Sequence, residues 1–391
     1  MRIVHIITRM ILGGAQENTL LTCAEQAARG HQVTLLSGPT AGPEGSLVDR
    51  VRATSGLAFQ EVPDLVRRPS PWHDARAGAA LRHRLAELRP DVVHTHSAKG
   101  GILGRHAAAA ACPRAAVVHT IHGLPFYGGQ NAFVRMFYTL LERRAARHTD
   151  RFISVCEAMT EEAVAAGLAG REKFTTVYSG MDVDTFVHVS GSPEAVRREL
   201  DLPAGAMVVL KLARLFHLKG HADVLRALAM IRQHHPTLHV VFAGDGVLRR
   251  RLDRQARRLG VRDRLRFAGL VPPERVPAMM HAADFLVHAS LREGLARVLP
   301  QALLSGRPAI SYDIGGAREV VHTGETGTLV AAGDWRGLAR AMEAMAGDRL
   351  MQRRMGERGR AMCLERFDYR RMVDAILAVY ERARTESGKT S

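Results

Sequence analysis

Short apolar segments rich in valine and isoleucine alternate along the chain with amphipathic stretches of about 12–18 residues. This alternation is typical of βα units, in which a helix follows each strand of a parallel sheet. In the first half we expect strands at Ile3–Ile7, Gln32–Leu36, Ala58–Val62, Val92–Thr95, Ala116–Thr120, Phe152–Val155 and Thr175–Tyr178. The helices expected between them include Ala15–Arg29, Ala75–Leu88 and Phe133–His148.

A second series of the same kind follows. Its predicted strands are Met207–Leu212, His239–Ala243, Leu265–Ala268, Phe285–His288, Ala309–Ser311 and Gly327–Val330. Its predicted helices include Asp223–Gln233, Leu248–Leu259 and Ala296–Leu304. Because 391 residues exceed what one domain usually holds, we predict an α/β protein with two doubly wound, Rossmann-like parallel sheets that face a cleft.

The domain boundary is expected where this alternation is interrupted. Residues 183–193 contain serine, glycine and proline and are the best candidate for a linker. We therefore assign residues 1–188 to the first domain and 189–368 to the second, and expect a helix at about 369–386 to pack back on the first domain.

The charge is the unusual part of the composition. Lys and Arg total 55 against 39 acidic residues, a formal net charge of +16. Such a field attracts phosphates, on nucleotides, nucleic acids or lipids, although an arginine-rich solvated surface gives the same number. No apolar run approaches the roughly 20 residues of a membrane-spanning helix. Four scattered cysteines argue against a disulfide framework, and the first residues suggest a strand rather than a secretory signal, so a cytoplasmic location is expected.

Ligands of open α/β sheets bind beyond the carboxyl ends of the strands, so the loops there hold the candidate residues. Gly13 and Gly14 follow the first strand, where they would form a tight turn or let a ligand approach the backbone. In the second half Arg214 and Lys219 share one loop, and they are either a clamp for a diphosphate or two surface cations.

Two further loops complete this set. Gly244 and Asp245 form a turn after a strand. Glu293 follows another strand. We expect the next helix to begin at Gly294 and Leu295, where its free N–H groups would favour an anion. Gln301, eight residues beyond Glu293, is expected on the same side of that helix.

In this combination and order the segments resemble the retaining glycosyltransferases of family 4, which have the GT-B fold. The resemblance rests on Gly13-Gly14, Arg214 with Lys219-Gly220, Gly244-Asp245-Gly246, Phe267-Ala268-Gly269, and Glu293 with Gln301. It extends over about residues 1–330. The family usually has a glutamate where this chain has Gln301, and Asn-Gly-Val-Asp where it has Ser179-Gly180-Met181-Asp182.

The resemblance implies transfer of a sugar from a UDP- or GDP-linked donor, with retention of configuration and without a metal or other cofactor. It implies that the second domain holds the donor and the first the acceptor. Arg214 and Lys219 would neutralise the diphosphate, Glu293 would orient sugar hydroxyls, and the Gly294 and Leu295 amides would add hydrogen bonds. The turn at Val271 would hold the base. Gln301 would bind the ribose without the charge of a carboxylate.

Histidines are numerous, so each is a weak signal. His94 and His96 alternate at a strand end, where they are either wall residues with hydrogen bonds or a metal pair without an acidic third ligand nearby. The resemblance places His122, in the sequence Thr-Ile-His-Gly, at the cleft, and we expect it to contact the transferred sugar. It need not be a general base, because the leaving phosphate can take the acceptor proton.

The segment 131–148 combines apolar residues at helical spacing with Arg135, Arg143, Arg144 and Arg147. It is either a helix with its apolar face in the core or a basic amphipathic helix on an anionic membrane. Many family relatives use lipid-linked acceptors, so peripheral contact with the inner membrane face is expected. The arginines of 249–258 suggest a solvated helix without nucleic-acid binding, because no aromatic residues lie among them.

Two alternative functions remain at this point. A nucleotide-sugar epimerase uses the same fold, and only the resemblance around Glu293 argues against it. A catalytically weak subunit that binds a nucleotide sugar is the other alternative, because Gln301 replaces a family glutamate.

Overall fold

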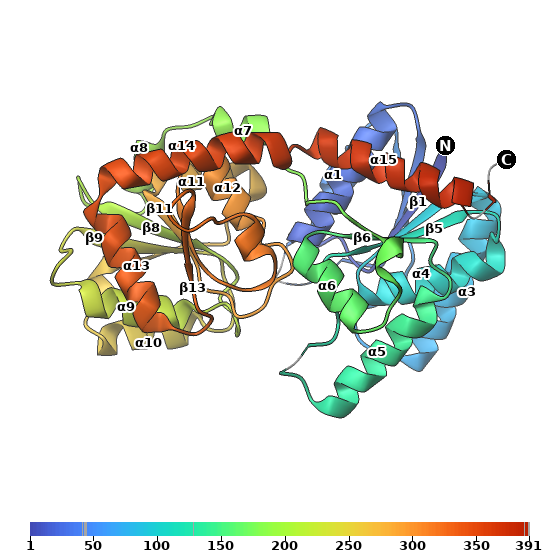
Figure 1. The fold of residues 1–391 in the computed structure, drawn as a ribbon, viewed down its shortest axis with the longest axis horizontal. Helices are drawn as coiled ribbons and strands as arrows, with labels where there is room; N and C mark the ends of the chain where they lie inside the picture. Colours follow the sequence, from blue (N-terminus) through green and yellow to red (C-terminus); the bar gives the residue numbers. More distant parts are fainter. Residues whose placement is uncertain (41, 43–44, 128, 387, 390–391) are drawn as a thin grey trace. The chain divides into compact units, whose positions relative to one another are not determined.

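The computed structural model describes residues 1–40, 42, 45–127, 129–386 and 388–389 (Figure 1). It divides into two compact units. Unit 1 comprises Met1–Met181 together with Tyr369–Ser391, and unit 2 comprises Asp182–Asp368. Each unit contains one parallel sheet with helices packed against it, as the alternation of strands and helices predicts.

Unit 1 has a seven-stranded parallel sheet in the order β3-β2-β1-β4-β5-β6-β7. The strands are β1 Arg2–Ile7, β2 Gln32–Ser37, β3 Leu57–Glu61, β4 Val92–His96, β5 Ala116–Ile121, β6 Arg151–Ser154 and β7 Phe174–Thr176. The helices are α1 Gly14–Ala28, α2 Val48–Arg52, α3 Pro71–Leu88, α4 Ala98–Ala111, α5 Ala132–Ala146, α6 Glu157–Ala165 and α15 Tyr369–Glu386.

Both faces of the unit 1 sheet are buried at its centre, where the residues of β4 and β5 are buried throughout rather than alternating with exposed ones. On one face Val4 and Val93 pack with Leu81 of α3 and Ala107 of α4. On the other face α15 packs against Ile3 and Val118 through a stripe at helical spacing. That stripe consists of Met372, Val373, Ile376, Val379, Tyr380 and Ala383.

Unit 2 has a six-stranded parallel sheet in the order β10-β9-β8-β11-β12-β13. The strands are β8 Met207–Leu212, β9 Leu238–Ala243, β10 Leu265–Gly269, β11 Phe285–His288, β12 Ala309–Tyr312 and β13 Gly327–Val330. The helices are α7 Val183–Val187, α8 Pro193–Glu199, α9 His221–Ile231, α10 Arg249–Arg258, α11 Val276–Ala282, α12 Val298–Leu304, α13 Trp335–Gly347 and α14 Arg349–Arg366.

The two-sheet α/β architecture is confirmed, and the expected strands are present with ends shifted by a residue or two. The expected boundary differs from the structure, because unit 1 ends at Met181 rather than at residue 188. The segment predicted as a linker begins with helix α7, which belongs to unit 2, where His281 donates a hydrogen bond to the Phe186 carbonyl at 2.7 Å. The terminal helix α15 belongs to unit 1.

None of the helices in the described residues is long and apolar enough to cross a bilayer.

Gly220 fixes the entry to α9 at the carboxyl end of β8. Its φ of +66° lies in the left-handed region, and a Cβ atom added there would lie 1.8 Å from the Ala289 carbonyl oxygen. The loop after β8 therefore lies directly against the end of β11, and only glycine permits this contact.

We predict that Gly220→Ala lowers the free energy of unfolding of unit 2 by at least about 3 kcal/mol, because it adds a backbone clash to the strain of a left-handed residue. The matched control is Gly205→Ala. Gly205 has a φ of +76° with no atom within 4 Å of an added Cβ, so only the strain of about 1–2 kcal/mol remains. Urea unfolding of both variants measures the difference, and equal losses would contradict this account.

Candidate active site

The candidate site of unit 2 lies at the carboxyl ends of β8 and β11. Lys219, in the loop after β8, donates a hydrogen bond from Nζ to Oε1 of Glu293, which follows β11. A backbone hydrogen bond of 2.8 Å from the Leu291 amide to the Leu218 carbonyl joins the same two loops. The structure thus brings together two residues that lie 74 positions apart in the sequence.

Glu293 is held as a carboxylate. Burial alone would raise its pKa, but the His288 ring and the Lys219 ammonium group outweigh the burial and lower the pKa to about 2. Nε2 of His288 lies 3.7 Å from Oε1 of Glu293, which is longer than an ordinary hydrogen bond but close enough for the ring to favour the carboxylate. A permanently ionised Glu293 accepts hydrogen bonds from hydroxyl groups and is unsuited to donate a proton at neutral pH.

Sequence reasoning missed His288, although it is the last residue of a predicted strand. Its Nδ1 lies 3.0 Å from Oγ of Ser311, and that hydroxyl donates to the Tyr312 carbonyl at 2.8 Å. The Ser311 oxygen therefore accepts from Nδ1–H, and this bond fixes the orientation of the ring beside Glu293. Burial is the main cause that lowers the pKa of His288.

Sequence reasoning also missed Lys211, which lies within β8 and is 1% exposed. Among the described residues its Nζ has no hydrogen-bond partner. Burial, reinforced by the positive charge of Lys219, lowers the pKa of Lys211 to about 7. The available signal was the lysine itself in an otherwise apolar strand, since unpaired lysines are rarely buried.

Arg214 and Asp245 are exposed at the carboxyl ends of β8 and β9. The guanidinium group of Arg214 lies 5.7 Å from the centre of the Phe216 ring. Gly244 precedes Asp245 with a φ of +135°, and an added Cβ would lie 2.2 Å from the Ala213 carbonyl oxygen. The turn therefore contacts the loop that carries Arg214. Val271 follows β10 at the same edge of the sheet.

The predicted helix after Glu293 is wrong at its start. Gly294 and Leu295 lie in a bend, and α12 begins only at Val298. The Gly294 carbonyl instead accepts a 2.9 Å hydrogen bond from the Gly316 amide. A start at Val298 also keeps Pro300 in the first helical turn, where its missing N–H breaks no hydrogen bond. Glu293 is therefore not on the helix of Gln301, which is 8% exposed on α12.

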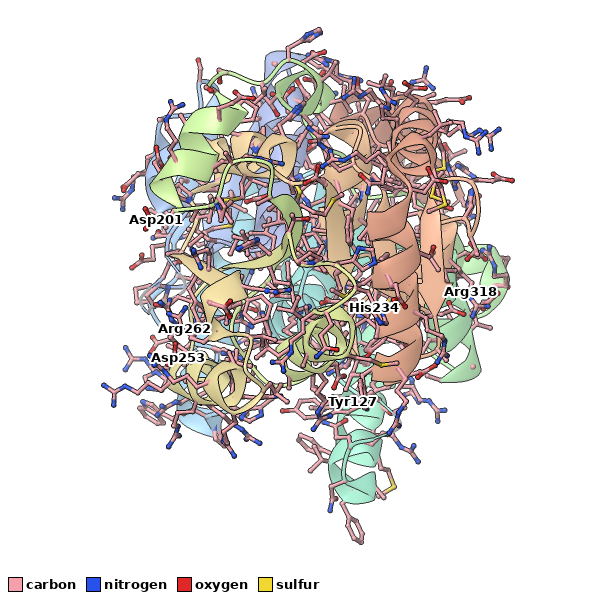
Figure 2. All side chains as sticks on the ribbon, turned by 90° about the vertical axis from the view of Figure 1, so that its left-hand side faces the viewer. Tyr127, Asp201, His234, Asp253, Arg262 and Arg318 are labelled. Atoms are coloured by element: carbon pink, nitrogen blue, oxygen red, sulfur yellow. The ribbon has the colours of Figure 1, made fainter. Side chains whose placement is uncertain are left out.

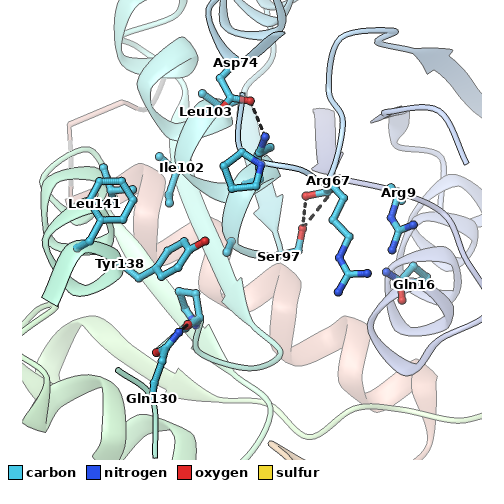
Figure 3. A pocket seen from close by; sticks show the side chains of 16 residues that line it. Arg9, Gln16, Arg67, Asp74, Ser97, Ile102, Leu103, Gln130, Tyr138 and Leu141 are labelled. Atoms are coloured by element: carbon cyan, nitrogen blue, oxygen red, sulfur yellow. Dashed lines mark hydrogen bonds and ion pairs between the residues drawn. The ribbon is translucent and has the colours of Figure 1, made fainter. Parts of the chain in front are cut away.

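Unit 1 contains a cavity of about 560 Å³ at the carboxyl ends of β1 and β4 (Figure 3). Gly14 begins α1 beside it, with Gly13 as the residue that caps the helix. Figure 3 shows Arg9, Gln16 and Arg67 on one side of the cavity and Tyr138 and Leu141 on the other. Lys99 also lines it and forms an ion pair with Asp74 at 2.5 Å. The cavity thus has a cationic wall and an apolar wall.

Three buried histidines form a cluster in unit 1. His94 and His96 are joined by His5, and one ring nitrogen of each lies within 4.8 Å of those of the other two. His96 also lies 3.2 Å from His122, the residue expected to contact sugar. Strand β1 therefore adds a third histidine to the pair on β4, because β1 and β4 are adjacent in the sheet.

Helix α5 is not a core-facing helix along its whole length. Its second half packs on unit 1, with Ala145 and Ala146 buried and Glu142 paired with the buried Arg105 of α4 at 2.5 Å. Its first half leaves large apolar side chains exposed, with 77% of Phe133 and 64% of Met136 accessible to solvent. The exposed apolar residues of α5 are Phe133, Val134, Met136, Phe137 and Leu140, which we call the α5 apolar stripe.

Helix α10 fits the prediction of a solvated helix. Most of its arginines are exposed, and Asp253 forms ion pairs with Arg257 at 3.0 Å and with Arg262 at 2.5 Å. Figure 2 shows Asp253 and Arg262 side by side at the surface.

Comparison with known proteins agrees with this architecture. Two family models match: "Glycosyl transferase 4-like domain" over residues 13–180 and "Glycosyl transferases group 1" over residues 193–362. The 2-deoxystreptamine N-acetyl-D-glucosaminyltransferase of Streptomyces fradiae is 30% identical over an alignment of 353 residues that covers 84% of this chain and 82% of that protein. The UDP-Gal:alpha-D-GlcNAc-diphosphoundecaprenol alpha-1,3-galactosyltransferase of Escherichia coli is 27% identical over an alignment of 383 residues that covers 97% of this chain and 96% of that protein.

Among solved structures, Anabaena HepE in complex with UDP-glucose superposes with a TM-score of 0.82 at 22% identity, over 98% of this chain and 100% of that chain. Two parallel-sheet units with this topology define the GT-B fold. Together with the family models and the Streptomyces relative, the fold shows that the chain belongs to the group 1, family 4-like glycosyltransferases and is a hexosyltransferase-type enzyme.

Lys211 generates a prediction about stability. The unfolded chain keeps the ordinary lysine pKa of 10.5, whereas folding lowers it to about 7. Between these values the unfolded state holds more protons, so this residue makes the free energy of unfolding rise with pH. Below pH 7 Lys211 is charged in both the folded and the unfolded state, so the whole free-energy cost of burying its charge reduces the stability of the fold.

We therefore expect Lys211→Met to raise the free energy of unfolding of unit 2 by a few kcal/mol at pH 6.5, at about 1.4 kcal/mol per pKa unit. The gain should shrink as the pH approaches 10.5, where lysine is neutral in both states and the comparison isolates packing. Urea unfolding across this range measures it. A gain that does not change with pH would contradict the assignment.

Proposed function

We propose that this enzyme transfers a hexosyl group from a nucleotide diphosphate sugar to a lipid-linked acceptor, with retention of anomeric configuration. The observation that carries the donor half is the convergence of Lys219 and Glu293 at the carboxyl edge of the unit 2 sheet. The E. coli relative is named for a UDP-galactose donor and a diphosphoundecaprenol acceptor, which supports both halves.

In this proposal the donor diphosphate binds to Lys219 and Arg214. Lys219 forms its ion pair with Glu293 at the end of the unit 2 sheet. A diphosphate would draw the ammonium group away and leave the Glu293 carboxylate to accept hydrogen bonds from sugar hydroxyls. The two cations would then stabilise the negative charge that grows on the leaving phosphate. They would supply the charge that a metal ion provides in other phosphate sites.

The remaining donor contacts extend along the same sheet edge. We assign the base to the turn at Val271 and the ribose to Gln301, with the Gly294 and Leu295 amides as further hydrogen-bond donors. Gly244 and Asp245 lie against the loop of Arg214 and would shape the phosphate site. In unit 1, Gly13 and Gly14 would let a ligand approach the backbone where α1 begins. His122 would contact the transferred sugar, and the leaving phosphate would take the acceptor proton.

The proposal of a lipid-linked acceptor rests on Phe137, which connects the α5 apolar stripe with the cavity of unit 1. Phe137 belongs to the α5 apolar stripe and also lines the cavity of unit 1. An apolar surface therefore continues from the exposed helix into a cavity whose opposite wall carries Arg9 and Arg67. A lipid with a phosphate headgroup matches this order of apolar and cationic surfaces, with its chain along α5 and its phosphates at the arginines.

The exposed arginines of α5 and of its C-terminal cap, which include Arg135, Arg144 and Arg147, favour an anionic membrane as the surface that covers the α5 apolar stripe. Binding would be peripheral, at the inner face of the cell membrane. The wide exposure of Phe133 and Met136 would otherwise leave a large apolar patch in water.

We predict that Arg214→Ala and Lys219→Ala each lower kcat/KM, because each removes a charge-assisted contact to the diphosphate. The expected loss of transition-state stabilisation is about 2–4 kcal/mol for each variant. Release of nucleoside diphosphate, measured with acceptor present, reports the effect. The matched control is Arg254→Ala, an exposed arginine of α10 in the same unit. Full activity in either site variant would rule out this donor site.

For the membrane we predict that the triple variant Phe133→Ser, Met136→Ser, Leu140→Ser binds anionic vesicles roughly 100-fold more weakly than the natural protein, because less apolar area is buried. Phe137 is left intact because it lines the cavity. Vesicle sedimentation measures binding, which salt should also weaken.

The matched control replaces Trp72, Val247 and Leu350, three exposed apolar residues outside α5, with serine. It should bind vesicles as the natural protein does. Equal binding by the two triple variants, or no binding by the natural protein at low salt, would contradict the role of α5.

A further inference from the structure

An unbroken series of hydrogen bonds runs through the interior of unit 1 from Gln26 to His122. Nε2 of His5 lies 2.8 Å from Oε1 of Gln26, and Nδ1 of His5 lies 2.9 Å from Nε2 of His96. Nδ1 of His96 in turn lies 3.2 Å from Nε2 of His122. Gln26, His5 and His96 are at most 1% exposed. We call Gln26, His5, His96 and His122 the histidine relay.

The two buried imidazoles of the relay are neutral. Burial lowers the pKa of His5 to about 4, and burial together with the neighbouring histidines lowers the pKa of His96 well below its ordinary value. A neutral imidazole has one N–H donor and one nitrogen acceptor. The donor-to-acceptor direction must therefore be the same for every hydrogen bond in the relay. If the donor is known at one end, it is known for all of them.

Gln26 fixes this direction at one end of the relay. Its Nε2 donates to the Tyr380 hydroxyl at 3.2 Å, which directs its Oε1 towards His5. Burial raises the pKa of Tyr380 well above its ordinary value, so the hydroxyl keeps its proton, and its oxygen lies 2.5 Å from Nδ1 of His94. Because Gln26 Oε1 can only accept, His5 donates from Nε2 and accepts at Nδ1.

The direction then passes along the relay. His96 donates from Nε2 to His5 and accepts at Nδ1, so His122 must donate from Nε2. We propose that His5 and His96 are positioning residues that orient the His122 ring for its contact with the transferred sugar, by holding the Nε2–H of His122 on Nδ1 of His96. The assignment of the sugar as the partner rests on the proposed function, whereas the fixed tautomer does not.

A metal ion bound by His5, His94 and His96 is the competing interpretation, because one nitrogen of each ring lies within 4.8 Å of those of the other two. The hydrogen bonds favour the relay. His94 is bonded at both nitrogens, to the Tyr380 hydroxyl and, at 2.6 Å, to Oγ1 of Thr120. His5 and His96 are likewise bonded at both nitrogens. A metal ion would have to break at least one of these buried hydrogen bonds at each ligand.

The test is to observe the protons directly. In protein labelled with 15N-histidine, scalar couplings across N–H···N hydrogen bonds identify the donor and the acceptor of each bond. We expect the proton on Nε2 of His122 to be coupled to Nδ1 of His96, and the proton on Nε2 of His96 to be coupled to Nδ1 of His5. The signals are assigned with His122→Gln and His5→Gln variants.

Two substitutions of one residue then separate positioning from structure. His96→Asn keeps an oxygen near the place of Nδ1 and should preserve the protected Nε2–H signal of His122. His96→Leu removes the acceptor, so that signal should be lost to exchange with water. We expect kcat to fall about tenfold in His96→Leu, with the donor KM unchanged and with recovery of most activity in His96→Asn. Thr120→Val removes a buried hydrogen bond of His94 outside the relay and should leave the His122 signal unchanged.

Three results would overturn the proposal: protons on Nδ1 of His96 and His5 in the natural protein, an unchanged His122 signal in His96→Leu, or one equivalent of bound metal in the purified protein. If His96→Leu does not fold, the couplings in the natural protein and in His96→Asn still decide. If the couplings appear as expected but no sugar transfer is found, the relay stands and the proposed function fails.

Discussion

The parallel direction of the strands in each sheet determines where chemistry can occur in this enzyme. Side chains that follow different strands meet at one edge of a sheet, however far apart they are in the sequence. The contact between Lys219 and Glu293 is the clearest result, because two loops separated by 74 positions become hydrogen-bonded neighbours. Gly220 makes this approach possible, since any side chain there would strike the Ala289 carbonyl.

The same constraint acts in unit 1, where it places charge and apolar surface together. Thr8 and Arg9 follow β1, Ser97 follows β4, and all three line the cavity that α5 closes on its apolar side. Beneath this edge, β1, β4 and β5 place His5, His96 and His122 in one series of hydrogen bonds. Both arrangements therefore follow from the order of the strands in the unit 1 sheet.

The strands and the order of motifs were predictable, because apolar runs and turn glycines are local signals. Features that depend on partners distant in sequence were not. Nothing near His94 and His96 in the sequence indicates that His5 completes their group. The sequence likewise shows Lys211 as one polar residue in an apolar strand and does not indicate that it is buried. Periodicity also predicted a helix from Ala296, whereas Pro300 and the bond from Gly316 to Gly294 delay it to Val298. The apolar spacing in α5 did not reveal which half faces water.

The most direct test of this account is to identify the product. The enzyme is incubated with a panel of UDP-, GDP- and ADP-sugars and with anionic vesicles that carry polyprenyl-diphosphate-linked saccharides, and the lipids and nucleotides are analysed by mass spectrometry. The account predicts that one lipid species gains a hexose with retained configuration, and that an equal amount of nucleoside diphosphate appears only when this acceptor is present. Nucleoside diphosphate released without an acceptor, or an epimerised nucleotide sugar with no change in the lipid, would contradict it.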